Sequence, residues 1–538
     1  MDVDLSRFET YEAACEGFEW DVPETFNMAD ALCGRWARRD DGKQRVALFY
    51  EGSDGTQETY TFWQIQRLAN RVSNALADLG VGPGTRVAIV LPQRPETLIA
   101  NLGVLQLGGI AVPLSVLYGT EGLRYRLGHS GSEVAIVDNE QAETVAELEG
   151  ELDALETVLT VGDPSAEGRS WEDVTASASP AFETVETDAE ESAYIIYTSG
   201  TTGDPKGAHH AHRSLLGYLP GWQMINEFPG DGAVHYTPSG WSWVGGLFAV
   251  CWGAWYHGQP VVGYGGRFEP ESVYEVLERY GVTNTLLTST MVRMLRETDH
   301  AEYDLDVEVV PSGGETVTED VIAFVEDEWD AVVNEIYGQT ECNFLIGTNS
   351  ALIGENREAT GKPCPGHEVA VIDPETGERK PPGEIGHIAV RRPDPSMLLD
   401  YWNQPELTAE LFVGEWMKTG DAGSFDEEGY IYYEGRADSV IVTSGYRVSP
   451  LEVEECLRDH GTVRDAVVVG VDHDQRGQAI KAFVTLTEGV EPSEDLSAEL
   501  QAFVKEREAA YKYPREVAFR DAFPTTASGK VQRHKLVE

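Results

Sequence analysis

Positive charge is scarce in this sequence. Its 538 residues contain 40 Lys and Arg against 92 Asp and Glu, which gives a formal net charge of −52. A field of that sign repels nucleic acids and anionic membranes, so we expect neither as a partner. The acids are dispersed, for example over 147–151 and 326–330, rather than gathered in one tail. Dispersed acidity predicts a halophilic protein with a surface adapted to high salt; an ordinary acidic cytosolic protein is the alternative.

The sequence also lacks closely spaced cysteine pairs, the pattern expected of a leader peptide, and long apolar runs. The six cysteines show no C-x-x-C spacing, so we expect reduced, mostly structural thiols. The acidic start at 1–4 lacks the basic region of a signal peptide. The most aromatic segment, 241–256, is shorter than the roughly 20 residues that span a bilayer. These features predict a cytoplasmic protein without a membrane segment.

The length and the rhythm of apolar runs predict an α/β protein of at least two domains, because one core rarely exceeds about 300 residues. Expected strands and helices alternate from residue 86 to about 337, which is typical of parallel sheets. Shorter strands and turns from about 367 predict a β-rich subdomain. We therefore expect a large N-terminal domain at 1–436 and a small, mobile α+β domain at 437–538.

Local signals add two detailed expectations. Pro311 is expected to end a strand at 307–310. Ser449, Pro450 and Glu452 have the spacing of a capping box that opens a helix, with Ser at the N-cap and Glu at the third position.

One stretch joins glycines, hydroxyls and a lysine to the end of an apolar run. It reads Thr198-Ser199-Gly200-Thr201-Thr202-Gly203-Asp204-Pro205-Lys206. Glycines let backbone N–H groups approach an anion, and hydroxyls and an ammonium add donors. The order of a Walker A loop fails here, which disfavours an ordinary P-loop NTPase. The stretch predicts a phosphate-binding loop; a flexible surface turn is the alternative.

Four further stretches carry similar chemistry: 312–316, 336–341, 418–421 and 525–530. In the second, a Tyr can stack on a purine, a Thr can bind a phosphate oxygen, and a Glu can help to hold Mg²⁺. In the third, a carboxylate can accept bonds from ribose hydroxyls. The last sets a lysine on a loop. A structural turn is the alternative for each one alone.

Together and in this order, the five stretches resemble the AMP-forming adenylate superfamily of acyl-CoA synthetases, luciferases and adenylation domains. The resemblance covers the chain from about residue 45. The segments 435–454 and 511–515 look most like medium-chain acyl-CoA synthetases. It implies a carboxylate:CoA ligase that uses ATP, Mg²⁺ and CoA. A carboxylate attacks the α-phosphate of ATP to give acyl-AMP and pyrophosphate, and the CoA thiol then displaces AMP.

The resemblance also implies roles for individual residues. Lys530, Thr340 and Arg447 would serve catalysis, and Glu341 would bind the metal. The implied ATP-binding residues are Thr198, Ser199, Gly200, Thr201, Thr202, Gly203, Asp204, Pro205, Lys206, Gly314, Glu315, Thr316, Glu335, Ile336, Tyr337, Gly338, Gln339, Thr340, Asp421, Arg436 and Lys530. The implied CoA-binding residues are Ser444, Gly445, Tyr446, Arg476, Lys505, Tyr513, Pro514 and Arg515; for Arg476, Lys505 and 513–515 a solvated surface is an equal alternative.

In such enzymes the small domain turns between the two half-reactions about a hinge, which aligns with Asp438. The turn withdraws Lys530 and presents 444–446 to the thiol. Ser439 departs from the second Asp that many relatives carry at this position.

The acyl pocket is expected to involve Trp241 and its neighbours in 237–246, with core packing as the alternative for the tryptophans. Gly313 and Gly338 lack side chains where relatives carry bulk, which suggests room for a medium-chain or short branched acid. An acetyl- or propionyl-CoA synthetase and an aryl-CoA ligase remain alternatives. Outside this class, so do a module that loads a carrier protein and a catalytically silent nucleotide-binding protein. A homodimer is left open.

Overall fold

The chain forms two compact units in the computed structural model, which describes residues 4–148, 150–162, 168–198, 204–354, 356–437, 439, 441–443, 446–473, 477–507, 512–525 and 531–537. The first unit comprises Met1–Glu368 and Arg392–Glu410, and the second comprises Val369–Arg391 and Leu411–Glu538. The β-rich segment after 367 thus clusters with the C-terminal residues. The expected boundary between the large domain and the mobile domain, at 436 and 437, stays a prediction, because a division into compact units does not show which residues move.

The first unit contains an eight-stranded sheet whose strands run parallel from β8 to β7. Its order is β19 (Asp400–Tyr401), β9 (Lys206–Ala211), β8 (Ser192–Thr198), β4 (Ile110–Pro113), β3 (Arg86–Val90), β5 (Val134–Asp138), β6 (Thr157–Val161) and β7 (Arg169–Ser170). Strands β9 and β19 are antiparallel additions at one edge.

Helices cover both faces of this sheet, because successive side chains of a buried strand point to opposite sides. Val87 and Ile89 of β3 pack with α3 (Phe62–Asp78) and α4 (Pro95–Gln106). Ala88 and Val90 pack with α5 (Thr120–Ser130) and α6 (Asn139–Leu148). Helix α7 (Trp171–Ser177) packs on α3. Both faces are therefore core, as a continuous apolar strand requires.

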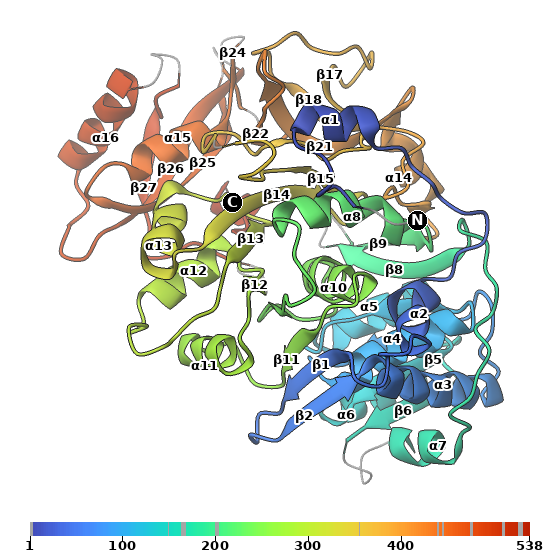
Figure 1. Ribbon diagram of the computed structural model, residues 1–538. Helices are drawn as coiled ribbons and strands as arrows, with labels where there is room; N and C mark the ends of the chain where they lie inside the picture. The colour runs from blue at the N-terminus through green and yellow to red at the C-terminus, as the bar shows by residue number, and fades with distance from the viewer. Residues whose placement is uncertain are drawn as a thin grey trace. The chain divides into compact units, whose positions relative to one another are not determined.

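A second, nine-stranded sheet completes the first unit (Figure 1). Its order is β16 (Lys362–Pro363), β15 (Asn343–Gly347), β14 (Val332–Gln339), β13 (Val309–Gly313), β12 (Asn284–Thr285), β10 (His235–Tyr236), β11 (Val261–Tyr264), β1 (Val46–Glu51) and β2 (Gln57–Thr61). The six strands β14, β13, β12, β10, β11 and β1 are all parallel to their neighbours within this group. Helices α11 (Pro270–Tyr280), α12 (Ser289–Arg296) and α13 (Glu319–Trp329) share one core with it.

The remaining helices of this unit are short, apart from α8 (Ser214–Ile225), which is buried throughout. They are α1 (Tyr11–Gly17), α2 (Arg35–Ala37), α9 (Val244–Gly246), α10 (Gly253–Tyr256), α14 (Pro405–Glu410) and the π-helices Asp30–Gly34 and Leu247–Trp252. None of the described helices is long and apolar enough to cross a membrane.

The second unit consists of two five-stranded sheets. The first contains β17 (Val369–Ile372), β18 (Gly386–Arg391), β21 (Trp416–Phe425), β20 (Phe412–Val413) and β22 (Ile431–Arg436). The second contains β24 (Tyr446–Val448), β23 (Ile441–Thr443), β26 (Gly477–Leu486), β25 (Val463–His473) and β27 (Glu516–Phe519), with helices α15 (Pro450–Arg458), α16 (Glu494–Arg507) and α17 (His534–Val537). The predicted α/β fold class, with parallel sheets followed by a small α+β part, is confirmed.

Two local expectations are wrong. Strand β13 runs through Pro311 to Gly313, because the Pro311 carbonyl still accepts a bond from the Leu287 N–H at 3.1 Å and only one donor is lost. Helix α15 does begin with Ser449 at the N-cap and Pro450 next to it, but the Ser449 hydroxyl makes no cap bond. It donates instead to the Glu434 carbonyl at 2.7 Å, so it ties α15 to β22.

Candidate functional site

The predicted phosphate-binding loop closes a hairpin between β8 and β9, where Thr198 pairs with Lys206. Ser199, Gly200, Thr201, Thr202 and Gly203 lie outside the described residues. The base of the loop is fixed, because the Tyr125 hydroxyl of α5 donates to the Pro205 carbonyl at 3.0 Å. The hydroxyl of Tyr197, just before the loop, donates to the Arg126 carbonyl at 3.2 Å.

Lys206 is half-buried at the first position of β9. Its Nζ lies 5.2 Å from the centroid of the Tyr401 ring, a cation–π contact. No carboxylate in the described part of the chain lies within ion-pair distance of this ammonium. In a protein of net charge −52, a half-buried cation without an acidic partner favours an external anion.

Glu341 follows the end of β14 and is 7% exposed. The Tyr401 hydroxyl donates to its Oε1 at 2.6 Å, and the Leu398 N–H donates to its backbone carbonyl at 2.7 Å. No group of three His, Cys, Asp or Glu side chains that could hold a metal exists among the described residues. One carboxylate nevertheless fits Mg²⁺, which commonly takes one or two protein carboxylates and completes its shell with substrate phosphates and water.

The segment 314–316 is held by its contacts with α12. Gly314 has a φ of +83°, which favours glycine. The Glu315 carboxylate accepts bonds from the Thr290 N–H at 2.6 Å and from the Thr290 hydroxyl at 3.0 Å. The Ser289 hydroxyl donates to the Thr316 carbonyl at 2.8 Å. Since the Glu315 side chain bonds to the first turn of α12, its backbone is the part that could meet a ligand.

Strand β14 supplies most of the predicted residues between 335 and 340, and it alternates in burial. Ile336 packs in a core cluster, whereas Tyr337, Gln339 and Thr340 are half-buried. The Glu335 N–H donates to the Thr348 hydroxyl at 2.8 Å. Tyr337 is the aromatic residue of this strand and is half-buried, and base stacking by its ring stays a prediction.

Two glycines that we expected to leave room for an acyl chain are packed against backbone. A Cβ on Gly338 would lie 1.7 Å from the Asn343 carbonyl oxygen, and one on Gly313 would lie 2.4 Å from that of Ile336. These glycines permit close strand packing and a bulge in β14, so the interpretation that they open a pocket is wrong. Trp241 is 1% exposed and belongs to the large core cluster, which favours its packing role.

Trp243 lies in the stretch 237–246 that we expected to contribute to the acyl pocket. Its side chain is 40% exposed, and its ring edge lies 3.6 Å from where a Cβ of Gly314 would stand. The ring also lies over Gly245, where a Cβ would come within 2.1 Å of it. This exposed indole beside Gly314 offers an apolar surface to a ligand. In the sequence, the glycines at 245 and 314 were the signal that a large ring could pack here.

In the second unit, the predicted ribose-binding residues Asp421 and Arg436 lie together. They are cross-strand partners in β21 and β22, and Arg436 Nη1 lies 3.1 Å from Asp421 Oδ1. Asp421 is buried and Arg436 is partly exposed, so the guanidinium orients a carboxylate that cannot turn to water.

Three of the predicted CoA-binding residues also come together. Arg515 and Lys505 both lie over the Tyr513 ring, at 3.7 Å and 5.5 Å from its centroid. The Arg515 N–H donates to the Ile480 carbonyl at 2.7 Å, and its carbonyl accepts from Gln501 at 3.0 Å. Pro514 between them is buried. Two cations on one ring form a local positive surface that suits phosphate groups.

Several predicted residues cannot be located in this way. Asp438, Ser444, Gly445, Arg476 and Lys530 lie outside the described residues. Tyr446 and Arg447 are in β24, where their backbones pair with Thr443 and Val442 of β23.

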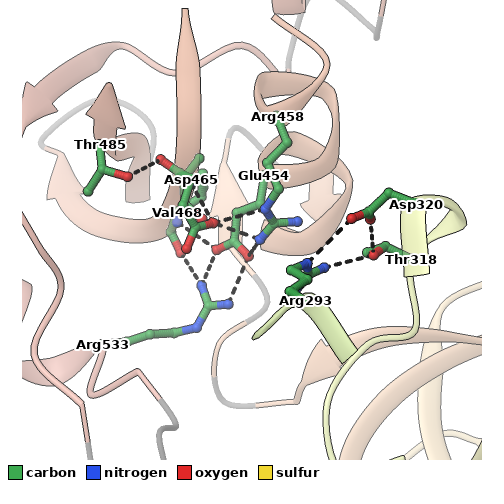
Figure 2. Close-up of polar contacts among 10 residues, drawn as sticks. Arg293, Thr318, Asp320, Glu454, Arg458, Asp465, Val468, Thr485 and Arg533 are labelled. Carbon is green, nitrogen blue, oxygen red and sulfur yellow. Dashed lines mark hydrogen bonds and ion pairs between the residues drawn. The ribbon is translucent and has the colours of Figure 1, made fainter. Parts of the chain in front are cut away.

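The segment after Lys530 is anchored within the second unit (Figure 2). Arg533 forms a two-pronged ion pair with the carboxylate of Glu454 and donates to the Val468 carbonyl at 2.7 Å. Thr525 and Val531 pair across the interval 526–530, and the Gln532 N–H donates to the Pro524 carbonyl at 2.8 Å. Both ends of that interval are therefore fixed.

Comparison with known families gives two matches. Residues 35–402 match the family model described as AMP-binding enzyme, and residues 452–530 match the AMP-binding enzyme C-terminal domain.

The similar proteins match nearly the whole length of this chain. An acetyl-coenzyme A synthetase of Bacillus subtilis is 34% identical, with 92% of this chain and 87% of that protein covered. The mitochondrial acyl-coenzyme A synthetase ACSM3 of Mus musculus is 31% identical, with 98% and 93% covered. Among solved structures, the anthranilate CoA ligase AuaEII in complex with anthranoyl-AMP has a TM-score of 0.85 at 29% identity, with 96% and 97% of the two chains covered. An acyl-CoA synthetase of Brucella canis has a TM-score of 0.77 at 30% identity, with 98% of both chains covered.

Proposed function

The chain belongs to the AMP-binding enzyme family and is an AMP-forming carboxylate:CoA ligase, and from that premise we propose that it activates a medium-chain or short branched carboxylic acid. The observation that carries the assignment to a nucleotide-dependent reaction is Lys206, a cation without an acidic partner among the described residues, at the closed end of a Gly- and hydroxyl-rich hairpin. The segment resemblance at 435–454 and 511–515 supports the chain-length class.

The reaction consists of two substitutions that need positioning and charge stabilisation rather than a protein nucleophile. In the first, the substrate carboxylate attacks the α-phosphate of ATP and pyrophosphate leaves. In the second, the CoA thiol attacks the acyl carbonyl and AMP leaves. Thr198 to Lys206 would hold the β- and γ-phosphates, and Lys530 and Thr340 would meet the developing charge at the α-phosphate.

The nucleoside would be held through its base and through its ribose. Tyr337 would stack on adenine, with the backbone of 314–316 and the residues 335–340 beside it. Asp421, oriented by Arg436, would accept bonds from the ribose hydroxyls. Glu341 would hold Mg²⁺. When bound, this cation would offset the negative charge of the leaving pyrophosphate.

We assign the second half-reaction to the C-terminal residues. Lys505, Tyr513, Pro514 and Arg515, together with Arg476, would bind the phosphates of CoA, and 444–446 would line the path of its thiol. Residues 437–538 would act as a lid that turns about Asp438, and Arg447 would then meet the substrate. The pair of cations on Tyr513 supports this assignment, because such a surface is unexpected on so acidic a chain.

We also infer a high-salt cytoplasm as the protein's environment. Six acids are buried among those whose side chains the structure describes: Glu51, Asp138, Glu341, Asp394, Asp421 and Glu454. The others face solvent fully or in part, where salt screens their repulsion. The described cysteines form no disulfide with one another, as is usual in a reducing compartment.

The substrate proposal is tested by pyrophosphate release with purified protein and a series of acids: acetate, butyrate, isobutyrate, hexanoate, octanoate and benzoate. We expect the highest kcat/KM for one of the acids of four to eight carbons. Acetate or benzoate as the best substrate would instead establish one of the two alternatives within the class.

A further inference from the structure

Tyr401 contacts two residues of the candidate site. Its hydroxyl donates to the Glu341 carboxylate, and its ring faces the ammonium of Lys206. Glu341 and Lys206 are 135 positions apart in sequence, and Tyr401 is distant from both. We propose that Tyr401 is a positioning residue that fixes the Glu341 carboxylate toward the metal and the Lys206 ammonium toward the terminal phosphates of ATP. This inference rests on the proposed function.

The backbone of Tyr401 is held in register with Lys206. Strand β19 pairs with β9, so that Tyr401 lies opposite Ala208, two residues after Lys206. The ladder continues on both sides, because the Trp402 N–H donates to the Gly207 carbonyl at 2.8 Å and the Leu399 N–H to that of His209 at 2.7 Å. The ring is therefore presented from a paired strand rather than from a loose loop.

The hydroxyl of Tyr401 directs a buried carboxylate. Tyr401 is 4% exposed and Glu341 is 7% exposed, and the oxygen–oxygen distance of 2.6 Å is that of a charge-assisted bond. A tyrosine hydroxyl is a neutral donor, so it orients the carboxylate without cancelling its charge. An Arg or Lys in its place would compete with a divalent cation for the same carboxylate.

The bond is not needed to hold the chain segments together. The Leu398 N–H already donates to the Glu341 carbonyl, and the Tyr401 N–H donates to the Thr408 hydroxyl at 2.9 Å. With the β19–β9 ladder, these backbone bonds survive the loss of the hydroxyl. Removing it should change the direction of the carboxylate more than the fold.

Tyr401→Phe tests the inference by calorimetric titration of the full chain with ATP, once with Mg²⁺ and once with EDTA. We expect binding of ATP with Mg²⁺ to weaken on the order of tenfold and binding with EDTA to change less than about twofold. Tyr274→Phe is the matched control, because it removes another buried hydroxyl, which donates to the Leu295 carbonyl at 3.0 Å outside the candidate site. It should leave both affinities unchanged.

Adding Tyr401→Phe to the Glu341→Gln variant shows whether the hydroxyl acts through the carboxylate or weakens ATP binding in general. Glu341→Gln should itself weaken binding of ATP with Mg²⁺, and Tyr401→Phe should cost nothing further in that background, because the hydroxyl acts through the carboxylate. Equal losses with Mg²⁺ and EDTA, or a full additional loss in the Glu341→Gln background, would overturn the inference while leaving the enzyme's class intact. Unchanged metal dependence of Glu341→Gln would overturn the metal role of Glu341 and the inference with it, whereas acyl-CoA formation by the unaltered protein would still support the proposed function.

Discussion

Arg533 pairs with Glu454 in two parallel contacts, although Glu454 is only 1% exposed (Figure 2). The same carboxylate accepts the Val468 N–H at 2.6 Å and lies 3.6 Å from Arg458. A residue of α15 is thereby connected to β25 and to the end of the chain. Arg533 is three residues after Lys530. This pair therefore fixes the C-terminal end of the interval 526–530, which carries the predicted catalytic lysine.

The pair predicts a large loss of stability when one partner is removed. Arg533→Met should lower the free energy of unfolding by about 3 kcal/mol or more, because it leaves the buried Glu454 carboxylate with Arg458 as its remaining cation. Denaturant unfolding at high salt measures the change. Arg507→Met, which breaks an exposed pair with Asp459, should cost about 1 kcal/mol or less. Similar losses for both variants would contradict the buried role of Glu454.

Separate variants should divide the two half-reactions. Lys530→Ala should abolish formation of acyl-AMP yet spare thioester formation from supplied acyl-AMP, because its charge is needed at the α-phosphate. Gly445→Leu should do the reverse, because a side chain there would block the thiol. Pyrophosphate release and CoA consumption measure the two steps. If both variants lost the same step, the lid proposal would be wrong for this protein.

Trp243→Ala should extend the range of acids toward longer chains. Removal of the exposed indole beside Gly314 opens an apolar space, so kcat/KM for the longest accepted acid should rise on the order of tenfold relative to butyrate. Trp63→Ala, in α3 and outside the candidate site, serves as the control and should leave the ratio unchanged. An unaltered chain-length profile for Trp243→Ala would remove Trp243 from the acyl pocket.

The net charge predicts that the fold depends on salt. The protein should unfold as the KCl concentration falls below about 1 M, because the Debye length grows from about 3 Å to about 10 Å at 0.1 M and the surface acids repel one another. Circular dichroism against KCl concentration measures this, and sucrose at equal osmolality should fail to replace the salt. Full stability in dilute buffer would disprove the adaptation.

Acid should destabilise the fold through a buried histidine. Burial lowers the pKa of His212 to about 3, and its Nδ1 accepts the Met28 N–H at 3.2 Å, so the folded state holds the neutral ring. The unfolded state takes up a proton near pH 6.5, so this contribution is complete above that pH and is lost as the pH falls toward 3. His212→Gln should reduce the slope of unfolding free energy against pH by up to about 1.4 kcal/mol per unit between pH 6 and 4. An unchanged slope at constant salt would contradict the neutral, buried state of His212.

Local sequence patterns were sufficient for the fold class and for the strand β8 that runs into the predicted phosphate-binding loop. Apolar runs followed by Gly-rich polar segments fix where a parallel strand ends, and polar side chains collect there. The family resemblance, rather than any local pattern, assigned Asp421 and Arg436 to one ligand and Lys505, Tyr513 and Arg515 to another, and the structure shows the contacts within each group.

Contacts across long separations were beyond those patterns. Trp241 and Trp243 are two residues apart, yet one is core and the other is exposed, which depends on how β11 and 314 approach them. Gly338 suggested an open pocket, whereas the Asn343 carbonyl occupies that direction. The bond between Tyr401 and Glu341 joins residues 60 positions apart, and no local pattern signals it.

The central claim is that this chain joins a carboxylic acid to CoA at the expense of ATP cleaved to AMP. The most direct measurement follows AMP, pyrophosphate and acyl-CoA together in one reaction of purified protein with ATP, Mg²⁺, CoA and hexanoate at high KCl. Equal amounts of the three products, with sustained AMP release that requires CoA, are the predicted result. Formation of ADP and phosphate, or AMP release that CoA does not accelerate, would contradict it.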